Sequence, residues 1–386
     1  MRRILACTLF ALFTAQLVSA EVTLTERKTL HQQIAQTGKD KPVHSRPDGT
    51  RATGSQTLID ASGLKYFINT NITFTSDASE DSGAMTEASY TAAVAATTLN
   101  GGTTSSTLND AFDGYNAICV SATGTGPCPS KGGGGGKGLG ATTALPTKGA
   151  AATYIPYNLN GPATTECGGR QVVTPVQTMN LGTSTIEVSR KIFVPSNDSF
   201  GRWLNIVKNT GAAPVTFNLI TANNLGSDDN TEIVTSSNGN NTAEITDTWI
   251  TSFQSYSGTT SSDVRLGHVL QGPGASNPVT FIFFADGNES PYWTYNITLA
   301  PGETRIIANF VVGQPSKAAA ATKSAQLVGL PANAVQCLTP AERNAITNFG
   351  PVAPPVPTLG QTGLVALGIL LAGFAVLVLR RRSAVA

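Results

Sequence analysis

The stretch WTYNITLAPGETRIIANFVV, from Trp293 to Val312, decides the fold. From Trp293 to Leu299 every second residue is apolar and those between are Thr or Asn, which is the period of a half-buried strand. Ala300–Glu303 then places Pro at the second and Gly at the third position of a type II turn. From Ile306 to Val312 apolar residues again share one face. The stretch therefore predicts two antiparallel strands joined by a tight turn.

The same signals recur upstream. Apolar side chains alternate from Ile186 to Val194, and two apolar runs, Arg202–Val207 and Val215–Ile220, flank the turn Lys208–Gly211. That turn predicts a hairpin with one residue at positive φ. With little helical periodicity in between, the pattern predicts a mainly β protein: a large antiparallel β-sandwich over residues 55–312, interrupted by a Gly-rich loop at 129–152.

The character of the sequence changes after the sandwich. Residues 313–350 predict a short helical tail, with helical composition from Ala318 to Leu330. Thr339-Pro340-Ala341-Glu342 has the residues of a capping box with Pro at the first helical position, so a second helix is expected from there to about Phe349. Residues 21–54 read as a polar lead-in.

Composition favours an extracellular protein. Hydrophobic residues make up 40% of the chain and charged residues only 13%, so Thr, Ser, Asn and Gly must supply most of the polar surface. Five of the 25 basic side chains, Arg2, Arg3 and Arg380–Arg382, lie in the terminal segments. The rest of the chain has 20 basic and 24 acidic side chains, which gives it a net charge of −4. A mildly acidic body without a basic stripe argues against nucleic acid as a partner.

Both ends have the composition of targeting segments. Residues 1–20 predict a signal peptide, with Arg2 and Arg3 before an apolar stretch and small residues at Val18–Ala20. Residues 351–386 combine a Pro-rich spacer, an apolar stretch at 363–379 and an arginine cluster. The apolar stretch predicts one transmembrane helix at the short limit of span length, with Arg380, Arg381 and Arg382 as the cytoplasmic membrane stop.

Val356, Pro357, Thr358 and Leu359, followed by the apolar stretch and the arginines, resemble the IPTL variant of the PEP-CTERM sorting signals. The resemblance implies a Gram-negative bacterium, the general export machinery and an exosortase-type membrane protease as partners. Val356 replaces the usual Ile, and Gly360–Thr362 replaces the usual Ser-Glu-Trp. A permanent single-span anchor is the alternative.

A second resemblance concerns the body. Short strings resemble a β-rich extracellular module of large secreted proteins that has no agreed activity. They are Asn109–Gly114, Val188–Lys191, Leu225–Asp228, Asp247–Trp249 and Leu266–Val269. The resemblance implies a fold and a location rather than a chemistry.

Four cysteines follow the signal segment: Cys119, Cys128, Cys167 and Cys337. An even number in an exported chain predicts two disulfides, and no tight spacing indicates zinc. We expect Cys119–Cys128 to close a loop and Cys167–Cys337 to tie the tail to the sandwich. Buried thiols are the alternative.

Candidate chemistry is sparse. His268 is the one histidine within the predicted sandwich, with Ser261, Ser262 and Asp263 close in sequence, but no nucleophile-elbow motif surrounds them, so a structural histidine is expected. The neighbouring carboxylates Asp228 and Asp229 would serve a glycosidase only poorly. Calcium is the one cofactor considered, with oxygen ligands from Asn109, Asp110 and Asp113 or from Asp228 and Asp229; plain turns are the alternative.

Sugar binding would need exposed aromatic side chains, and Trp203, Trp249 and Trp293 are the candidates, with core positions expected for each. The sequence as a whole predicts a non-enzymatic, exported component of the cell surface or of an exopolysaccharide matrix. The alternatives are a carbohydrate-binding module and, with less support, a secreted hydrolase.

Overall fold

The computed structural model describes residues 55–70, 84–90, 94–97, 103–106, 112, 114–126, 128, 154–157, 163–227, 231–254 and 264–350. The two predicted targeting segments, the polar lead-in and the Gly-rich loop lie outside these residues. The chain divides into one compact unit up to Gly350 and a second from Pro351 to Ala386.

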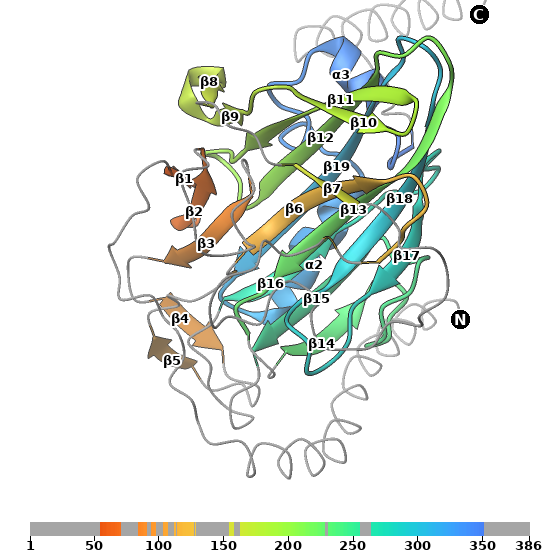
Figure 1. Ribbon diagram of the computed structural model, residues 1–386. Coiled ribbons are helices and arrows are strands. Elements are labelled where there is room, and N and C mark those ends of the chain that lie inside the picture. Colours follow the sequence, from red (N-terminus) through yellow and green to blue (C-terminus); the bar gives the residue numbers. More distant parts are fainter. Residues whose placement is uncertain are drawn as a thin grey trace, which may run out of the picture. The chain divides into compact units, whose positions relative to one another are not determined.

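Within the described residues the fold is mainly β and antiparallel, with few helices (Figure 1). The first sheet has the order β1 (Ser55–Ile59), β2 (Leu64–Asn69), β3 (Met85–Tyr90), β6 (Gly114–Ser121), β13 (Val215–Asn224), β18 (Tyr292–Leu299) and β17 (Val279–Phe283), with β7 (Tyr154–Pro156) on β6. The second has the order β14 (Thr231–Ser236), β15 (Trp249–Gln254), β16 (Arg265–Val269), β19 (Thr304–Gln314), β12 (Gly201–Asn209), β11 (Ser184–Phe193), β9 (Gln171–Val173) and β8 (Thr164–Glu166), with β10 (Gln177–Leu181) on β11. The remaining elements are the β4–β5 pair (Val94–Thr97 and Thr103–Ser106), the 3-10 turn η1 (Cys167–Gly169) and the helices α2 (Lys317–Val328) and α3 (Pro340–Ala345).

Both predicted hairpins are wrong, because each predicted turn leads from one sheet to the other. β12 and β19 pair in the second sheet, whereas β13 and β18 pair in the first. The Ala300–Glu303 turn itself forms as expected, with Gly302 at φ 76°. The turn at Lys208–Gly211 contains no residue at positive φ. Instead, the Asn209 side chain accepts from the Gly211 amide (2.8 Å) and donates to the Leu299 carbonyl (3.1 Å), so it links the β12–β13 connection to the β18–β19 connection.

One hydrophobic core takes side chains from both sheets. Trp203 and Val207 of β12 contribute from the second sheet, and Trp293 and Tyr295 of β18 from the first. Full burial of such large apolar side chains supplies most of the driving force for folding.

The second sheet is also covered on its outer face. Helix α2 packs on β15, β16 and β19, and Figure 1 shows it behind that sheet. A Cβ at Gly267 of β16 would collide with Ser324 Oγ of the helix, so only glycine allows this close approach. The face of β19 that carries every second residue from Ile306 to Val312 therefore contacts the tail. Ile307 and Val311, on the opposite face, contact the core.

The helices begin as predicted but differ in length. Ser316 caps α2, and Thr339 with Glu342 forms the predicted capping box of α3. Helix α3 ends at Ala345 rather than near Phe349, because Ile346 becomes extended and bridges Ile306 of β19. Among the described residues, no helix is long and apolar enough to cross a membrane; the predicted span at 363–379 lies outside them and stays a prediction.

Candidate functional site

The C-terminal tail, residues 315–350, is the candidate site, because it joins the β body to the segment that resembles a sorting signal. It runs from β19 through α2 and α3 over the outer face of the second sheet.

The end of the tail is pinned by its backbone and by one buried amide. Asn348 Nδ2 donates to the carbonyls of Leu270 (2.7 Å) and Ala308 (2.6 Å), and its Oδ1 accepts from the Ala308 amide (2.8 Å). The Gly350 amide then donates to the Pro273 carbonyl (2.9 Å). Buried hydrogen bonds of this kind are costly to break, so the tail stays docked up to the last described residue.

Arg202 of β12 lies fully buried beneath the middle of the tail. Its Nη1 donates to the carbonyls of Ala334 and Gln336 (both 2.8 Å), and Nη2 donates to Gln171 Oε1 (2.8 Å). The guanidinium also lies 4.7 Å from the centre of the Phe193 ring. Burial lowers the pKa of Arg202 to about 9, so the side chain is still charged at neutral pH. A buried cation thus holds two tail carbonyls that have no strand partner.

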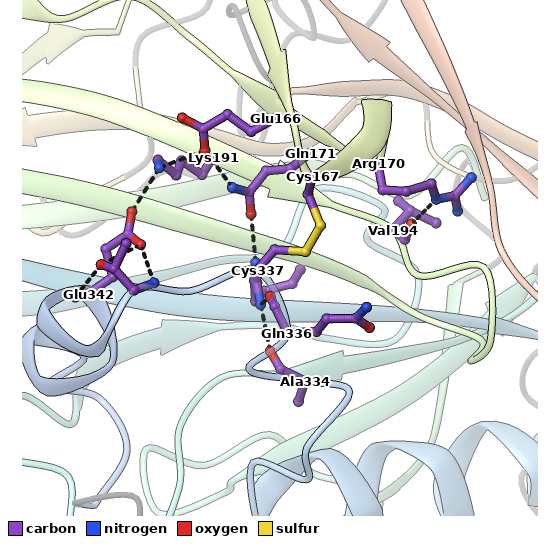
Figure 2. The surroundings of a disulfide bond; sticks show 12 residues. Glu166, Cys167, Arg170, Gln171, Lys191, Val194, Ala334, Gln336, Cys337 and Glu342 are labelled. Atoms are coloured by element: carbon purple, nitrogen blue, oxygen red, sulfur yellow. Dashed lines mark hydrogen bonds and ion pairs between the residues drawn. A yellow bond between two sulfur atoms is a disulfide. The ribbon is translucent and has the colours of Figure 1, made fainter.

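A disulfide closes the same region from the edge of the sheet. Figure 2 shows Cys167, which follows β8, joined to Cys337 of the tail, with a Cα–Cα distance of 6.0 Å. Both cysteines have positive φ, 55° and 63°, a conformation that non-glycine residues adopt only when their surroundings hold them. This is the pairing that the sequence predicted.

An ion-pair bridge lies beside the disulfide. Lys191 Nζ of β11 is 2.9 Å from Glu166 Oε2 and 2.8 Å from Glu342 Oε1 of α3 (Figure 2). Burial alone would lower the pKa of Lys191, but the two carboxylates outweigh it and raise it. Burial would raise the pKa of Glu342, whereas its hydrogen bonds to Lys191 and Thr339 lower it. We call the disulfide, Arg202 and the Lys191–Glu342 pair the clamp.

Replacing Arg202 by methionine is expected to lower the free energy of unfolding by about 3 kcal/mol, because the Ala334 and Gln336 carbonyls lose their charged donor. Chemical denaturation measures this loss, and limited proteolysis should cut between Leu330 and Leu338 faster than in the native chain. Lys208→Met on the same strand is the matched control: its exposed pair with Glu187 (3.9 Å) should be worth less than about 1 kcal/mol. Equal losses in the two variants would contradict the role of Arg202.

The second disulfide lies on the outer face of the first sheet. Cys119 of β6 pairs with Cys128, as predicted, with a Cα–Cα distance of 5.7 Å. The loop that it closes is fixed by the Gly126 amide on Tyr154 Oη (3.1 Å) and by Asn218 Nδ2 on the Gly124 carbonyl (2.9 Å). Cys119 and Cys128 form a small apolar cluster with Tyr292, against which the half-buried Phe281 and Phe283 pack.

His268 is a core residue, as expected. It is fully buried, and rings of Tyr115, Phe284 and Trp293 surround it at 5.3–6.4 Å between centroids. Its Nε2 lies 3.1 Å from Ser252 Oγ, which is buried as well, so a substrate cannot reach either group. Ser261, Ser262 and Asp263 lie outside the described residues.

A second buried polar group crosses the core. The Arg190 side chain of β11 donates from Nε to Asn205 Oδ1 (3.0 Å) and from Nη2 to Asn116 Oδ1 (2.7 Å) and the Asn116 carbonyl. Asn116 in turn donates to Asn309 Oδ1 (3.2 Å). These bonds join β6 of the first sheet to β11, β12 and β19 of the second. Arg190 is in phase with Val188 and Ile192, so the alternation on β11 places it on the buried face, but it gives no sign of the residues that Arg190 binds.

The other candidate residues divide into two groups. Trp203 and Trp293 are buried, so neither presents a ring to a sugar, whereas Trp249 is half-buried. The calcium candidates Asn109, Asp110, Asp113, Asp228 and Asp229 lie outside the described residues. Their neighbours are brought together, since the Phe112 amide donates to the Leu225 carbonyl (3.0 Å). Within the described residues, no cluster of three metal-binding side chains occurs.

Sequence reasoning missed Arg202, Gln171 and Asn348. One signal was present: Arg202, Leu204 and Ile206 lie opposite the core-facing Trp203 and Val207, so from residue 202 to 207 both faces of β12 are apolar apart from Arg202 and Asn205. A strand of that kind is covered on both sides. Nothing local, however, indicates which segment covers it.

Comparison with known proteins identifies the C-terminal segment. The family model of the IPTL-CTERM motif matches residues 354–382, so the chain carries a C-terminal sorting signal of this type. The match begins four residues beyond Gly350, where the pinned tail ends. Val356–Leu359, the predicted sorting motif, and Arg380–Arg382, the predicted membrane stop, lie inside the matched range. No curated protein matches the chain.

Solved structures show only a loose likeness. A protein described as a kojibiose phosphorylase from the human microbiome is 10% identical, with a TM-score of 0.30, over 44% of this chain and 21% of its own length. The Slr1438 protein of Synechocystis sp. PCC 6803 is 8% identical, with a TM-score of 0.38, over 69% of this chain and 97% of its own. A galactose mutarotase-like protein from Lactobacillus casei is 12% identical, with a TM-score of 0.37, over 68% and 100%. Similarity this low supports no statement about activity.

Proposed function

We propose that this protein is a non-enzymatic, exported component of the cell surface or of an exopolysaccharide matrix, whose C-terminal segment is processed by an exosortase-type protease. The observation that carries the proposal is the clamp, which precedes the sorting signal in the sequence. A disulfide, a buried arginine and an ion-pair bridge fix residues 334–342 to the β body, and the IPTL-CTERM segment begins at residue 354.

The clamp suits a protein that is held by its C-terminal end. Any pull on that end reaches Asn348 and Cys337 first, and both are fixed to the second sheet or its edge. A tail that packed loosely would unfold before it transmitted force to the body. The two disulfides are also consistent with the oxidising environment outside the cytoplasm.

The burial of the candidate catalytic side chains, among the residues that the structure describes, agrees with a structural role. The histidine considered as a catalytic base is buried among aromatic rings, beside a serine that is equally inaccessible. The two sheets share one core and thus support a sandwich, an architecture that hosts many binding and structural proteins. Calcium at Asn109–Asp113 or Asp228–Asp229 stays a prediction.

The mass of the C-terminal peptide of the mature protein, taken from its native host, tests the proposal. We expect a peptide that ends near Thr358 and lacks the apolar stretch 363–379. Pro357→Ala, inside the sorting motif, should instead leave a chain that ends at Ala386, whereas Gln361→Ala, outside the motif, should be processed normally. If the native protein itself ends at Ala386, it is a single-span membrane protein and the processing part of the proposal is wrong.

A further inference from the structure

Strand β17, at the edge of the first sheet, has the sequence of an interior strand. It reads Val279-Thr280-Phe281-Ile282-Phe283 and pairs with β18 on one side. A nearly continuous apolar run is typical of a strand that is covered on both faces and has neighbours on both sides. Among the described residues, no strand pairs with its other side.

The burial of β17 is incomplete on both of its faces. Ile282 points inward and packs on the main core, while Phe281 and Phe283 point outward and pack on the apolar cluster around Tyr292. All three side chains are only half-buried. Rings of Phe281 and Phe283 lie at 5.6 and 5.4 Å from the Tyr292 ring, centroid to centroid, nearly parallel to it. A further strand beside β17 would extend both the core and this row of rings.

Three other edge strands, β1, β14 and β8, have the protection that exposed edges normally carry. At β1 the Arg170 side chain donates to the Ile59 carbonyl (2.5 Å). Strand β14 carries Glu232, paired with Lys317 (3.4 Å), and β8 is a three-residue strand that ends in a charged residue, Glu166. No charged residue occurs from Ala275 to Phe284. A bulge between Val279 and Phe281 interrupts β17, and Gln271 Oε1 accepts from the Val279 amide (2.6 Å), so Phe281–Phe283 is the regular, open part of the edge.

We infer that a second copy of this chain pairs its β17 antiparallel with β17 of the first, which makes a two-fold dimer with a sheet continuous across the interface. Antiparallel pairing of a strand with itself satisfies two-fold symmetry, so the contact closes at two copies. The body carries a net negative charge, yet the ten residues around β17 carry none, so the two copies meet without repulsion between like charges. The inference does not depend on the proposed function.

Hydrogen exchange of the native full chain over a range of concentrations, with mass measured in parallel, tests the dimer. The β17 amides that do not pair with β18 should gain protection as the dimer mass appears. Equal protection at every concentration would mean that another part of the same chain covers the edge, and rapid exchange at every concentration would mean that nothing does. Either result overturns the inference.

A charge placed in the pairing region gives the second test. Phe283→Lys sets two ammonium groups near each other across the two-fold axis and should raise the dimer dissociation constant about 100-fold or more. The matched control is Ile59→Lys, an exposed apolar residue (42%) of β1 at the opposite edge of the same sheet, which should leave the constant unchanged. A dimer that persists in folded Phe283→Lys protein would refute pairing through β17.

Discussion

Replacing both Cys167 and Cys337 by serine is expected to lower the free energy of unfolding by about 5 kcal/mol. The bond joins positions 170 residues apart, so the unfolded chain loses more conformational freedom through it than through a short loop. Both positions also have positive φ, and serines there would keep that unfavourable backbone without the bond that holds it. Denaturant unfolding of the oxidised native protein and of the double variant measures the difference.

The second disulfide supplies a matched comparison. Cys119 and Cys128 are nine residues apart, for which the same relation gives about 2.6 kcal/mol. The two double-serine variants should also fail differently under limited proteolysis: loss of Cys167–Cys337 should expose the tail around Leu330–Leu338, and loss of Cys119–Cys128 should not. If the short-loop variant were the less stable of the two, the tail disulfide would not be the main covalent support of the body.

Local sequence patterns predicted features that depend on neighbours in the chain. The capping box at Thr339 forms because its two partners are three residues apart, and the turn at Pro301-Gly302 forms because those residues prefer its dihedral angles. The alternation of β18 correctly indicated one buried face. Each of these is a property of a few consecutive residues, so a single sequence contains it.

The pairing of strands is a different kind of information. Alternation reports that one face of a strand is buried, but it does not report which strand lies beside it. The turns after Lys208 and Leu299 are short enough for hairpins, yet both lead to the opposite sheet. Asn209 forms bonds at both crossings, and no local pattern distinguishes it from an ordinary turn asparagine.

Only part of the clamp could be predicted from the sequence, for the same reason. The sequence predicted the Cys167–Cys337 bond because four cysteines in an exported chain allow few pairings. Arg202, Gln171 and Asn348 were not found, since the hydrogen bonds of Arg202 and Asn348 span 31 or more residues of chain and are mostly to backbone groups. Backbone groups carry no sequence signature, so long-range bonds to them cannot be read from a single chain.

Lowering the pH from 6.5 to 4.5 is expected to reduce the free energy of unfolding by about 2.3 kcal/mol through His268 alone. Burial among aromatic rings lowers the pKa of His268 to about 3 from its ordinary value of 6.5. Below pH 6.5 the unfolded chain binds a proton that the folded chain cannot take up until pH 3 is approached. Stability from the neutral histidine is therefore complete above pH 6.5 and is lost as the pH falls, by about 4 kcal/mol in total at pH 3.

The carboxylates with lowered pKa values do not obscure this range, and Asp60 acts in the opposite direction to His268. Burial raises the pKa of Asp60 above its ordinary 3.8, so the folded chain takes up that proton first and gains stability as the pH falls. Asp198, Glu303 and Glu342 have lowered pKa values in the folded protein, so the stability they contribute is lost only as the pH falls below their ordinary values of 3.8 to 4.5. His268→Gln keeps an amide within reach of Ser252 but cannot be protonated, so its unfolding free energy should change far less between pH 6.5 and 4.5. The difference between the two proteins cancels any effect of the other histidines. A variant that loses as much stability as the native protein over this range would show that another group is responsible, and that His268 is not the acid-sensitive element of the core.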